Sequence, residues 1–211
     1  LLAFIALTPR GAERCYTAFQ LWPEHDERRA KANLRSALWR LGKASPDLID
    51  ATKSHLRLSS CVWVDVRDGI ANLEVTTGDS VAAACALPFQ ALDSDLLPDW
   101  YDDWLSVERE RLRQFRLGSL EDGAASALDR GRPAQAIQLA LAAIAADPLR
   151  ESAHRLVAAA HIDNGNLADA MRQYETFAAI VEAQLGCEPS AKFLALIDGA
   201  LAAHRPVLVA V

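Results

Sequence analysis

The amino-acid sequence predicts a mainly α-helical protein, in which an N-terminally truncated winged helix-turn-helix precedes a tetratricopeptide-like α-α superhelix. Two observations support this fold class. A basic amphipathic segment is followed by short alternating segments, which is the order of a recognition helix and its wing. A glycine-centred motif recurs after 34 residues, which is the period of the tetratricopeptide repeat. We therefore expect a winged helix-turn-helix DNA-binding domain over residues 1–66 and a tetratricopeptide-like domain over residues 67–205.

The composition is that of a folded globular protein, because 51% of the 211 residues are hydrophobic and 24% are charged. The net charge of −6 is unevenly distributed along the chain. Residues 1–66 contain ten basic and seven acidic side chains, a charge of +3, and the remainder contains 12 and 21, a charge of −9. A basic first part attached to an acidic body suits a DNA-binding domain joined to a protein-facing module.

Both ends of the chain are apolar but short. Leu1–Leu7 and Pro206–Val211 fall far below the roughly 20 residues that cross a bilayer, which predicts a cytoplasmic protein without membrane contact. The first segment also lacks an initiator Met and the basic residues of a signal peptide, so we expect the chain to begin inside a structural element. The four cysteines form no C-x-x-C pair and predict neither a zinc site nor a disulfide framework.

Three helices are predicted in the first 66 residues. Leu1–Leu7 is the end of an apolar helix. A second helix covers Ala12–Trp22, where apolar side chains recur at spacings of three, four and seven. A third covers Glu27–Leu41 and is expected to end at Gly42, where a left-handed cap has little steric cost.

The third helix has one apolar side and one basic side. At 100° per residue its leucines and small residues fall together, and these are Ala30, Leu34, Ala37, Leu38 and Leu41. The other side carries Arg28, Arg29, Asn33, Arg35, Ser36, Trp39 and Arg40. An ordinary solvated amphipathic helix has the same pattern, so the neighbouring elements must decide what the basic side does.

A hairpin is predicted after the third helix. Leu48–Ala51 and His55–Leu58 alternate with period two and flank the polar tip Thr52–Ser54. Cys61–Val66 alternates again, with its valines on one side, and favours another extended segment. Helix, helix, basic helix and hairpin follow one another as in a winged helix-turn-helix, whose wing reaches the DNA backbone.

The helical body is predicted from turn signals and from a repeat. Val81–Leu87 is expected to be helical, and a long helix is expected to begin near Pro98, with Trp100 and Trp104 as hydrophobic anchors one turn apart. The final helix of the stack is expected over Ala191–Ala203.

The repeat pairs Ala127–Ala136 with His161–Ala170 and thereby Gly131 with Gly165, at the tight turn between two helices. Stacks of this kind bind proteins or peptides on a concave face.

The sequence does not predict an enzyme. It contains no P-loop, dinucleotide-binding, zinc-protease or nucleophile-elbow motif. The five histidines are scattered, and only His154 and His161 are spaced to share a helix face. We therefore expect no catalytic residues, no metal site and no cofactor.

Four segments resemble the antibiotic regulatory protein (SARP) class of transcriptional activators. They are Ala32–Leu41 (ANLRSALWRL), Leu97–Trp104 (LPDWYDDW), Asp147–Leu156 (DPLRESAHRL) and Leu185–Ser190 (LGCEPS). The resemblance spans nearly the whole chain and implies an OmpR-like winged helix followed by a bacterial transcriptional activator domain. It also implies binding to direct repeats of double-stranded promoter DNA and recruitment of RNA polymerase. Two features depart from the family: its amino-terminal strands are absent, and Thr17 stands where an aliphatic core residue is usual.

The resemblance, carried over position by position, assigns DNA contacts to polar side chains of the third helix and the wing. These are Arg28, Arg29, Asn33, Arg35, Ser36, Arg40, Lys53 and Arg57. Most are expected at phosphates, although Arg and Asn can also pair with G and A.

The sequence thus predicts a sequence-specific DNA-binding activator. The alternative is a protein-binding scaffold or effector-sensing module in which the winged helix is degenerate. A homodimer is compatible with both.

Overall fold

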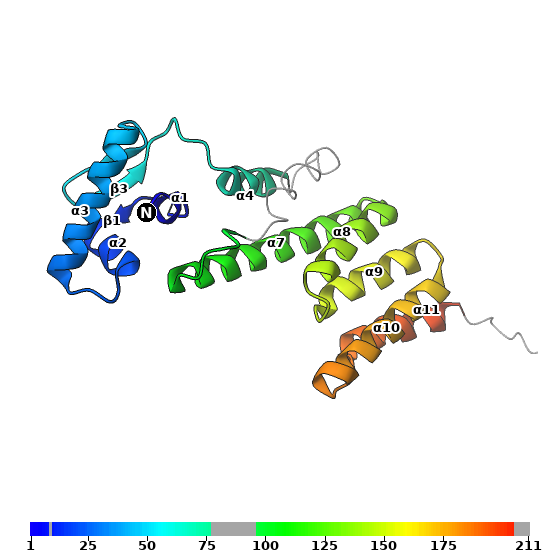
Figure 1. Cartoon of the computed structure of the whole chain (residues 1–211). Helices are drawn as coiled ribbons and strands as arrows, with labels where there is room; N and C mark the ends of the chain where they lie inside the picture. Colours follow the sequence, from blue (N-terminus) through cyan, green and yellow to red (C-terminus); the bar gives the residue numbers. More distant parts are fainter. Residues whose placement is uncertain (9, 77–95, 205–211) are drawn as a thin grey trace, which may run out of the picture. The chain divides into compact units, whose positions relative to one another are not determined.

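The computed structural model describes residues 1–8, 10–76 and 96–204, and of residues 71–76 only the backbone (Figure 1). The described residues form two compact units, one of residues 1–74 and 96–110, the other of residues 75–76 and 111–204. Both are rich in helix, which confirms the predicted mainly α fold class. No helix among the described residues is long and apolar enough to span a membrane. The helix expected over Val81–Leu87 lies outside the described residues.

The first unit contains helices and a small sheet (Figure 1). Its elements up to the end of the hairpin are α1 (Leu2–Ala6), β1 (Ala12–Glu13), α2 (Arg14–Leu21), α3 (Glu27–Ala44), β2 (Ile49–Ala51) and β3 (His55–Leu58). The helix α4 (Asp65–Thr76) follows. The order of elements is that of a winged helix-turn-helix, as the sequence predicts.

The sheet has the strand order β1-β3-β2, and both pairings are antiparallel. In the predicted hairpin, Ile49 faces Leu58 and Asp50 faces Arg57. The sequence missed β1, whose Ala12 pairs with Leu56 and was assigned to the second helix. Gly11 leads into this strand with a φ of +83°, and a Cβ at this position would lie 3.1 Å from the Leu56 carbonyl oxygen. A glycine is therefore required where the chain turns onto the sheet.

The winged helix has a hydrophobic core to which both its helices and its sheet contribute. Its buried members come from α1, α2, α3 and β3, and they are Ile5, Ala18, Ala30, Leu34, Leu56 and Leu58. Alternation along β3 buries both of its leucines and exposes His55 and Arg57. The apolar side of α3 is thus held inward by helices and sheet together.

Two further predictions for this unit were wrong. The helix α3 continues through Gly42 to Ala44, and it ends because Ser45 is extended before Pro46, where the ring disfavours a helical residue. Cys61–Val66 contains no strand, because the chain turns after Ser59 and α4 begins at Asp65. Val62 and Val64 still pack against the core. The alternating pattern therefore indicated which side chains are buried, although the segment pairs with no described strand.

The long helix α7 (Asp103–Asp129) begins five residues later than the expected Pro98 and continues from the first unit into the second. Before it, Leu97 has a φ of +50°, and the Arg109 guanidinium donates hydrogen bonds to the carbonyl oxygens of Leu96 and Leu97. This turn leaves Trp100 41% exposed, whereas Trp104 is buried with its ring 5.2 Å from that of Phe4. Only one of the two tryptophans is therefore an anchor.

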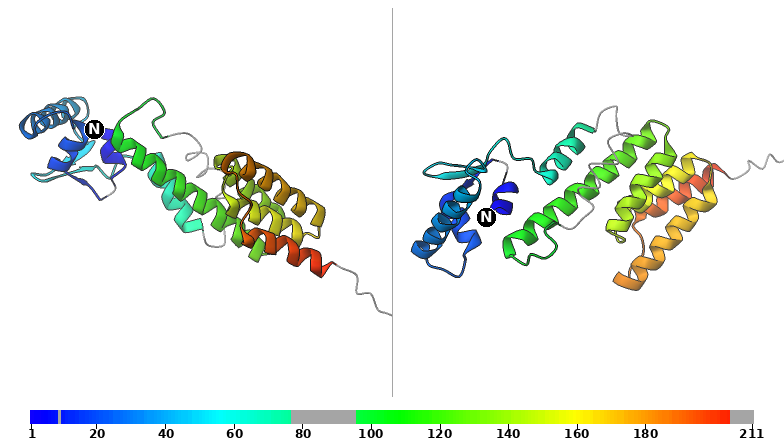
Figure 2. Two further views of the ribbon diagram at one scale, coloured as in Figure 1. Left: turned by 90° about the horizontal axis from the view of Figure 1, so that it is seen from below. Right: turned by 45° about the horizontal axis from the view of Figure 1, so that its top comes forward.

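The second unit is a stack of antiparallel helices, which lie side by side in Figure 2. After α7 come α8 (Pro133–Ala146), α9 (Glu151–Asp163), α10 (Leu167–Leu185) and α11 (Ala191–Ala203). The predicted repeat is confirmed, because Gly131 and Gly165 occupy the α7–α8 and α9–α10 turns with φ of +65° and +75°. The predicted last helix has the bounds of α11. Its Phe193 packs in a core with Phe177 and Val181 of α10.

Candidate nucleic-acid interface

The helix α3 is fixed at its start by a side-chain cap and along its length by its buried side. The Asp26 carboxylate accepts a hydrogen bond from the Arg29 backbone N–H at 2.8 Å, as an N-cap residue does. Ala30 and Leu34 are fully buried one turn apart. Because the apolar stripe is anchored, the polar side of the helix faces away from the core.

The predicted site residues of α3 lie on that polar side. Arg28, Arg29, Arg35, Ser36 and Arg40 are exposed, and Asn33 is partly buried at the edge. Within the described residues, none of these arginines forms an ion pair with a carboxylate. Their guanidinium groups are therefore available to an anionic partner such as a phosphate backbone.

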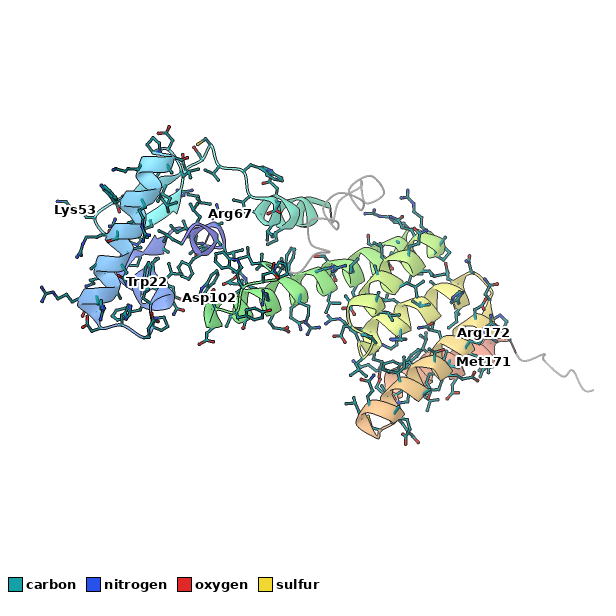
Figure 3. All side chains as sticks on the ribbon, in the orientation of Figure 1. Trp22, Lys53, Arg67, Asp102, Met171 and Arg172 are labelled. Atoms are coloured by element: carbon teal, nitrogen blue, oxygen red, sulfur yellow. The ribbon has the colours of Figure 1, made fainter. Side chains whose placement is uncertain are left out.

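The two predicted wing residues are exposed as well. Lys53 lies in the turn between β2 and β3 (Figure 3). Arg57 is exposed on β3, between the buried Leu56 and Leu58. The turn is held by the Thr52 hydroxyl, which accepts a hydrogen bond from the His55 backbone N–H at 2.9 Å. The Arg14 guanidinium at the start of α2 donates to the Thr52 carbonyl oxygen at 3.1 Å. The wing tip is thus tied to the second helix.

Arg67 of α4 connects that helix to α1 and lies near the wing. Its Nε donates to the Ala6 carbonyl oxygen at 2.6 Å and its Nη2 to that of Ile5 at 2.9 Å. Burial, together with the neighbouring positive charge of Arg57, lowers the pKa of Arg67. The Arg67 guanidinium donates to carbonyl groups at the end of α1, where no further helical turn supplies backbone N–H donors.

Two residues on the outward side of α3 were not among the predicted site residues. Trp39 is 63% exposed among the basic residues. The Lys43 ammonium group stands 4.2 Å from the centre of the Trp39 ring. The helical period already placed Trp39 on this side, but Lys43 was excluded because the helix was expected to end at Gly42.

The family model of the bacterial transcriptional activator domain matches residues 74–200, which is more than half of the chain. The chain belongs to this family. Members of the bacterial transcriptional activator domain family are regulators of transcription, so the regulator class expected from the sequence is confirmed. Among the described residues, no three His, Cys, Asp or Glu side chains gather as a metal site would require.

The chain also resembles a solved structure, that of EmbR from Mycobacterium tuberculosis in complex with low affinity phosphopeptide. The TM-score is 0.66 at 18% sequence identity, and the match covers 97% of this chain and 60% of that one. At this identity the likeness concerns the fold, and it supports the winged helix followed by a helical superhelix. Together with the family match it confirms the SARP-type activator predicted from the motifs. No curated protein matches the chain.

Proposed function

We propose that this member of the bacterial transcriptional activator domain family binds double-stranded DNA sequence-specifically through α3 and the β2–β3 wing. One observation carries the proposal: the arginines of α3 are exposed, while Ala30 and Leu34 hold the opposite side of the helix in the core. A helix fits the major groove, where Arg pairs with guanine and Asn with adenine. Lys53 and Arg57 would contact phosphates beside the groove. The helix would contribute the remaining DNA contacts, through Arg28, Arg29, Asn33, Arg35, Ser36 and Arg40.

We assign DNA binding and activation to different parts of the sequence. Residues 1–66, with their net positive charge, are the proposed DNA-binding domain, and the acidic residues 67–205 are the proposed activation domain that recruits RNA polymerase. The proposed targets are direct repeats at promoters, each repeat bound by one copy, so that a homodimer would form on the DNA. Action on the chromosome implies a cytoplasmic location.

The first test is selection of bound duplexes from a random pool by the full chain, followed by a salt series on the selected duplex. We expect the logarithm of the binding constant to fall by about 0.9 per logarithmic unit of salt for each phosphate neutralised. Arg35→Ala with Arg40→Ala should weaken binding and, where both residues contact phosphates, reduce that slope by about 2.

The matched control is Arg130→Ala with Arg132→Ala, which removes the same charge from an exposed turn of the repeat. The control should bind DNA like the original chain. Equal binding by both double variants would contradict the proposal and favour a scaffold with a degenerate winged helix.

Recruitment is tested separately, with RNA polymerase and a promoter that carries the selected repeats. We expect the full chain to increase promoter occupancy by the polymerase, and the Arg35→Ala, Arg40→Ala variant to lose this effect. If DNA binding occurs without any increase in occupancy, the activator part of the proposal is wrong and the DNA-binding part remains.

A further inference from the structure

Trp39 is a large apolar side chain on a side of α3 that is otherwise polar. With 100° per residue, it points within about 40° of the direction opposite the apolar stripe, in which Ala30 and Leu34 are buried and Leu38 and Leu41 are partly buried. Its 63% exposure is high for an indole within a helix of eighteen residues. A single exposed hydrophobic residue is normal on a protein surface, so its surroundings must show whether it has a role.

The surroundings of Trp39 form a shallow depression of about 360 Å³, lined by Arg35, Ser36, Trp39 and Arg40. Three of these four residues belong to the proposed DNA interface. The polar neighbours bond back onto the helix: the Ser36 hydroxyl donates to the Ala32 carbonyl oxygen at 3.0 Å, and Arg40 Nε donates to the Ser36 carbonyl oxygen at 3.4 Å. The indole is therefore the apolar wall of a hollow whose other walls are polar or cationic.

The Trp39 ring also contacts a cationic side chain of its own helix. The Lys43 ammonium lies 4.2 Å from its centre, a cation–π contact that holds a positive charge against the indole. A polyanionic partner that approaches this face meets Lys43, Arg35 and Arg40 around an aromatic surface. This combination fits a nucleic-acid groove, where phosphates flank base edges that include an apolar group.

We propose that Trp39 recognises the C5 methyl group of thymine in the major groove. The proposal rests on the proposed function and names one base that the interface reads. The thymine methyl is the apolar group among the donors and acceptors of the major-groove edges, and apolar side chains recognise it by contact. The arginines beside Trp39 supply phosphate or guanine contacts, whereas the indole supplies discrimination for thymine.

The test uses the full chain and the duplex selected from the random pool. Each thymine is replaced in turn by uracil, which removes only the methyl group and leaves base pairing and phosphates unchanged. We expect the affinity of the original chain to fall about fourfold at one thymine of each repeat, the factor for one buried methyl-sized group. Trp39→Ala should bind thymine and uracil duplexes equally at that position, and Trp39→Phe should retain discrimination.

Two control variants separate this effect from general loss of binding. Arg35→Ala should lower affinity and still discriminate thymine from uracil. Tyr101→Ala removes another exposed aromatic ring, outside α3, and should change neither quantity. The thermal unfolding midpoint of each variant shows that its fold is retained.

The outcomes are distinguishable. If Trp39→Ala binds more weakly but loses the same factor on uracil substitution, or if no uracil substitution affects the original chain, the thymine assignment is wrong while DNA binding stands. If the original chain binds no duplex at low salt, the proposed function fails and the thymine assignment fails with it.

Discussion

The Arg150 guanidinium binds both carboxylate oxygens of Glu121, with Nε donating to Oε1 at 2.9 Å and Nη2 to Oε2 at 2.8 Å. The Ser152 hydroxyl donates to the same carboxylate. Burial raises the pKa of Glu121, but the hydrogen bonds and charge of Arg150, with the Ser152 bond, outweigh it and lower the pKa overall. This contact joins α7 to the start of α9 and thereby links one helix pair of the repeat to the next.

Arg150→Ala should lower the free energy of unfolding of the helical unit by about 1–3 kcal/mol, because bidentate charged hydrogen bonds are lost and Glu121 stays partly buried. Arg172→Ala is the control, since its ion pair with Asp169 is largely exposed and should contribute about 0.5 kcal/mol or less. Urea unfolding measures both. The folded pKa of Glu121 is lowered, so the contribution is present above the ordinary value of 4.5 and is lost as pH falls through the folded pKa. A loss for Arg150→Ala that stays constant into strong acid would contradict this assignment.

A second prediction concerns pH and the buried His154. Its Nε2 lies 3.0 Å from the Pro148 carbonyl oxygen, which can only accept, so its Nδ1 accepts from the Gln173 amide at 2.7 Å. Burial lowers the pKa of His154 despite the opposing effect of the Pro148 bond. Because the folded pKa lies below the unfolded one, stability is full above about 6.5 and declines as pH falls from that value toward the folded pKa.

The thermal unfolding midpoint should therefore decrease between pH 7.5 and pH 5.5, over about the range in which unfolded His154 takes up a proton. Gln173→Glu places a carboxylate beside Nδ1, favours the protonated ring and should weaken or reverse this decrease. An identical pH profile in both proteins would show that His154 does not control it.

The turn glycines provide a third prediction. Gly165→Ala forces a Cβ into a left-handed conformation and should destabilise the helical unit by about 1–2 kcal/mol. Gly118→Ala, within α7 and with open space around its added Cβ, should instead stabilise it by roughly 0.5–1 kcal/mol. Opposite shifts of the denaturation midpoint are the expected result, and shifts of the same sign would contradict it.

Thr17, which departs from the family pattern, provides the fourth prediction. It is fully buried, and its hydroxyl donates to the carbonyl oxygen of Glu13, the N-cap residue of α2, at 2.8 Å. The polar group is thus satisfied inside the core. Thr17→Val should change the free energy of unfolding by less than about 1 kcal/mol, because the Glu13 carbonyl begins the helix and keeps a backbone donor. A loss of 2 kcal/mol or more would show that the hydroxyl has a larger structural role.

The sequence by itself determined the elements whose signals are local. Gly131 and Gly165 mark turns because a left-handed residue without a Cβ is favoured at the turn itself, and the apolar period places Ala191–Ala203 in one helix. The same period oriented α3, so the exposure of its arginines was predicted from the residues alone. Whether those arginines contact DNA stays a prediction.

Only the tertiary structure decided the features that depend on distant partners. The strand β1 exists because β3 offers it backbone groups to pair with, although the local sequence favours helix. Trp104 is buried and Trp100 is exposed because Arg109 holds the turn at Leu96 and Leu97 and delays the start of α7. Hydrogen bonds and packing between residues far apart in the chain outweighed local preference at these positions, since a sequence pattern records the residue's own tendency and not its eventual neighbour.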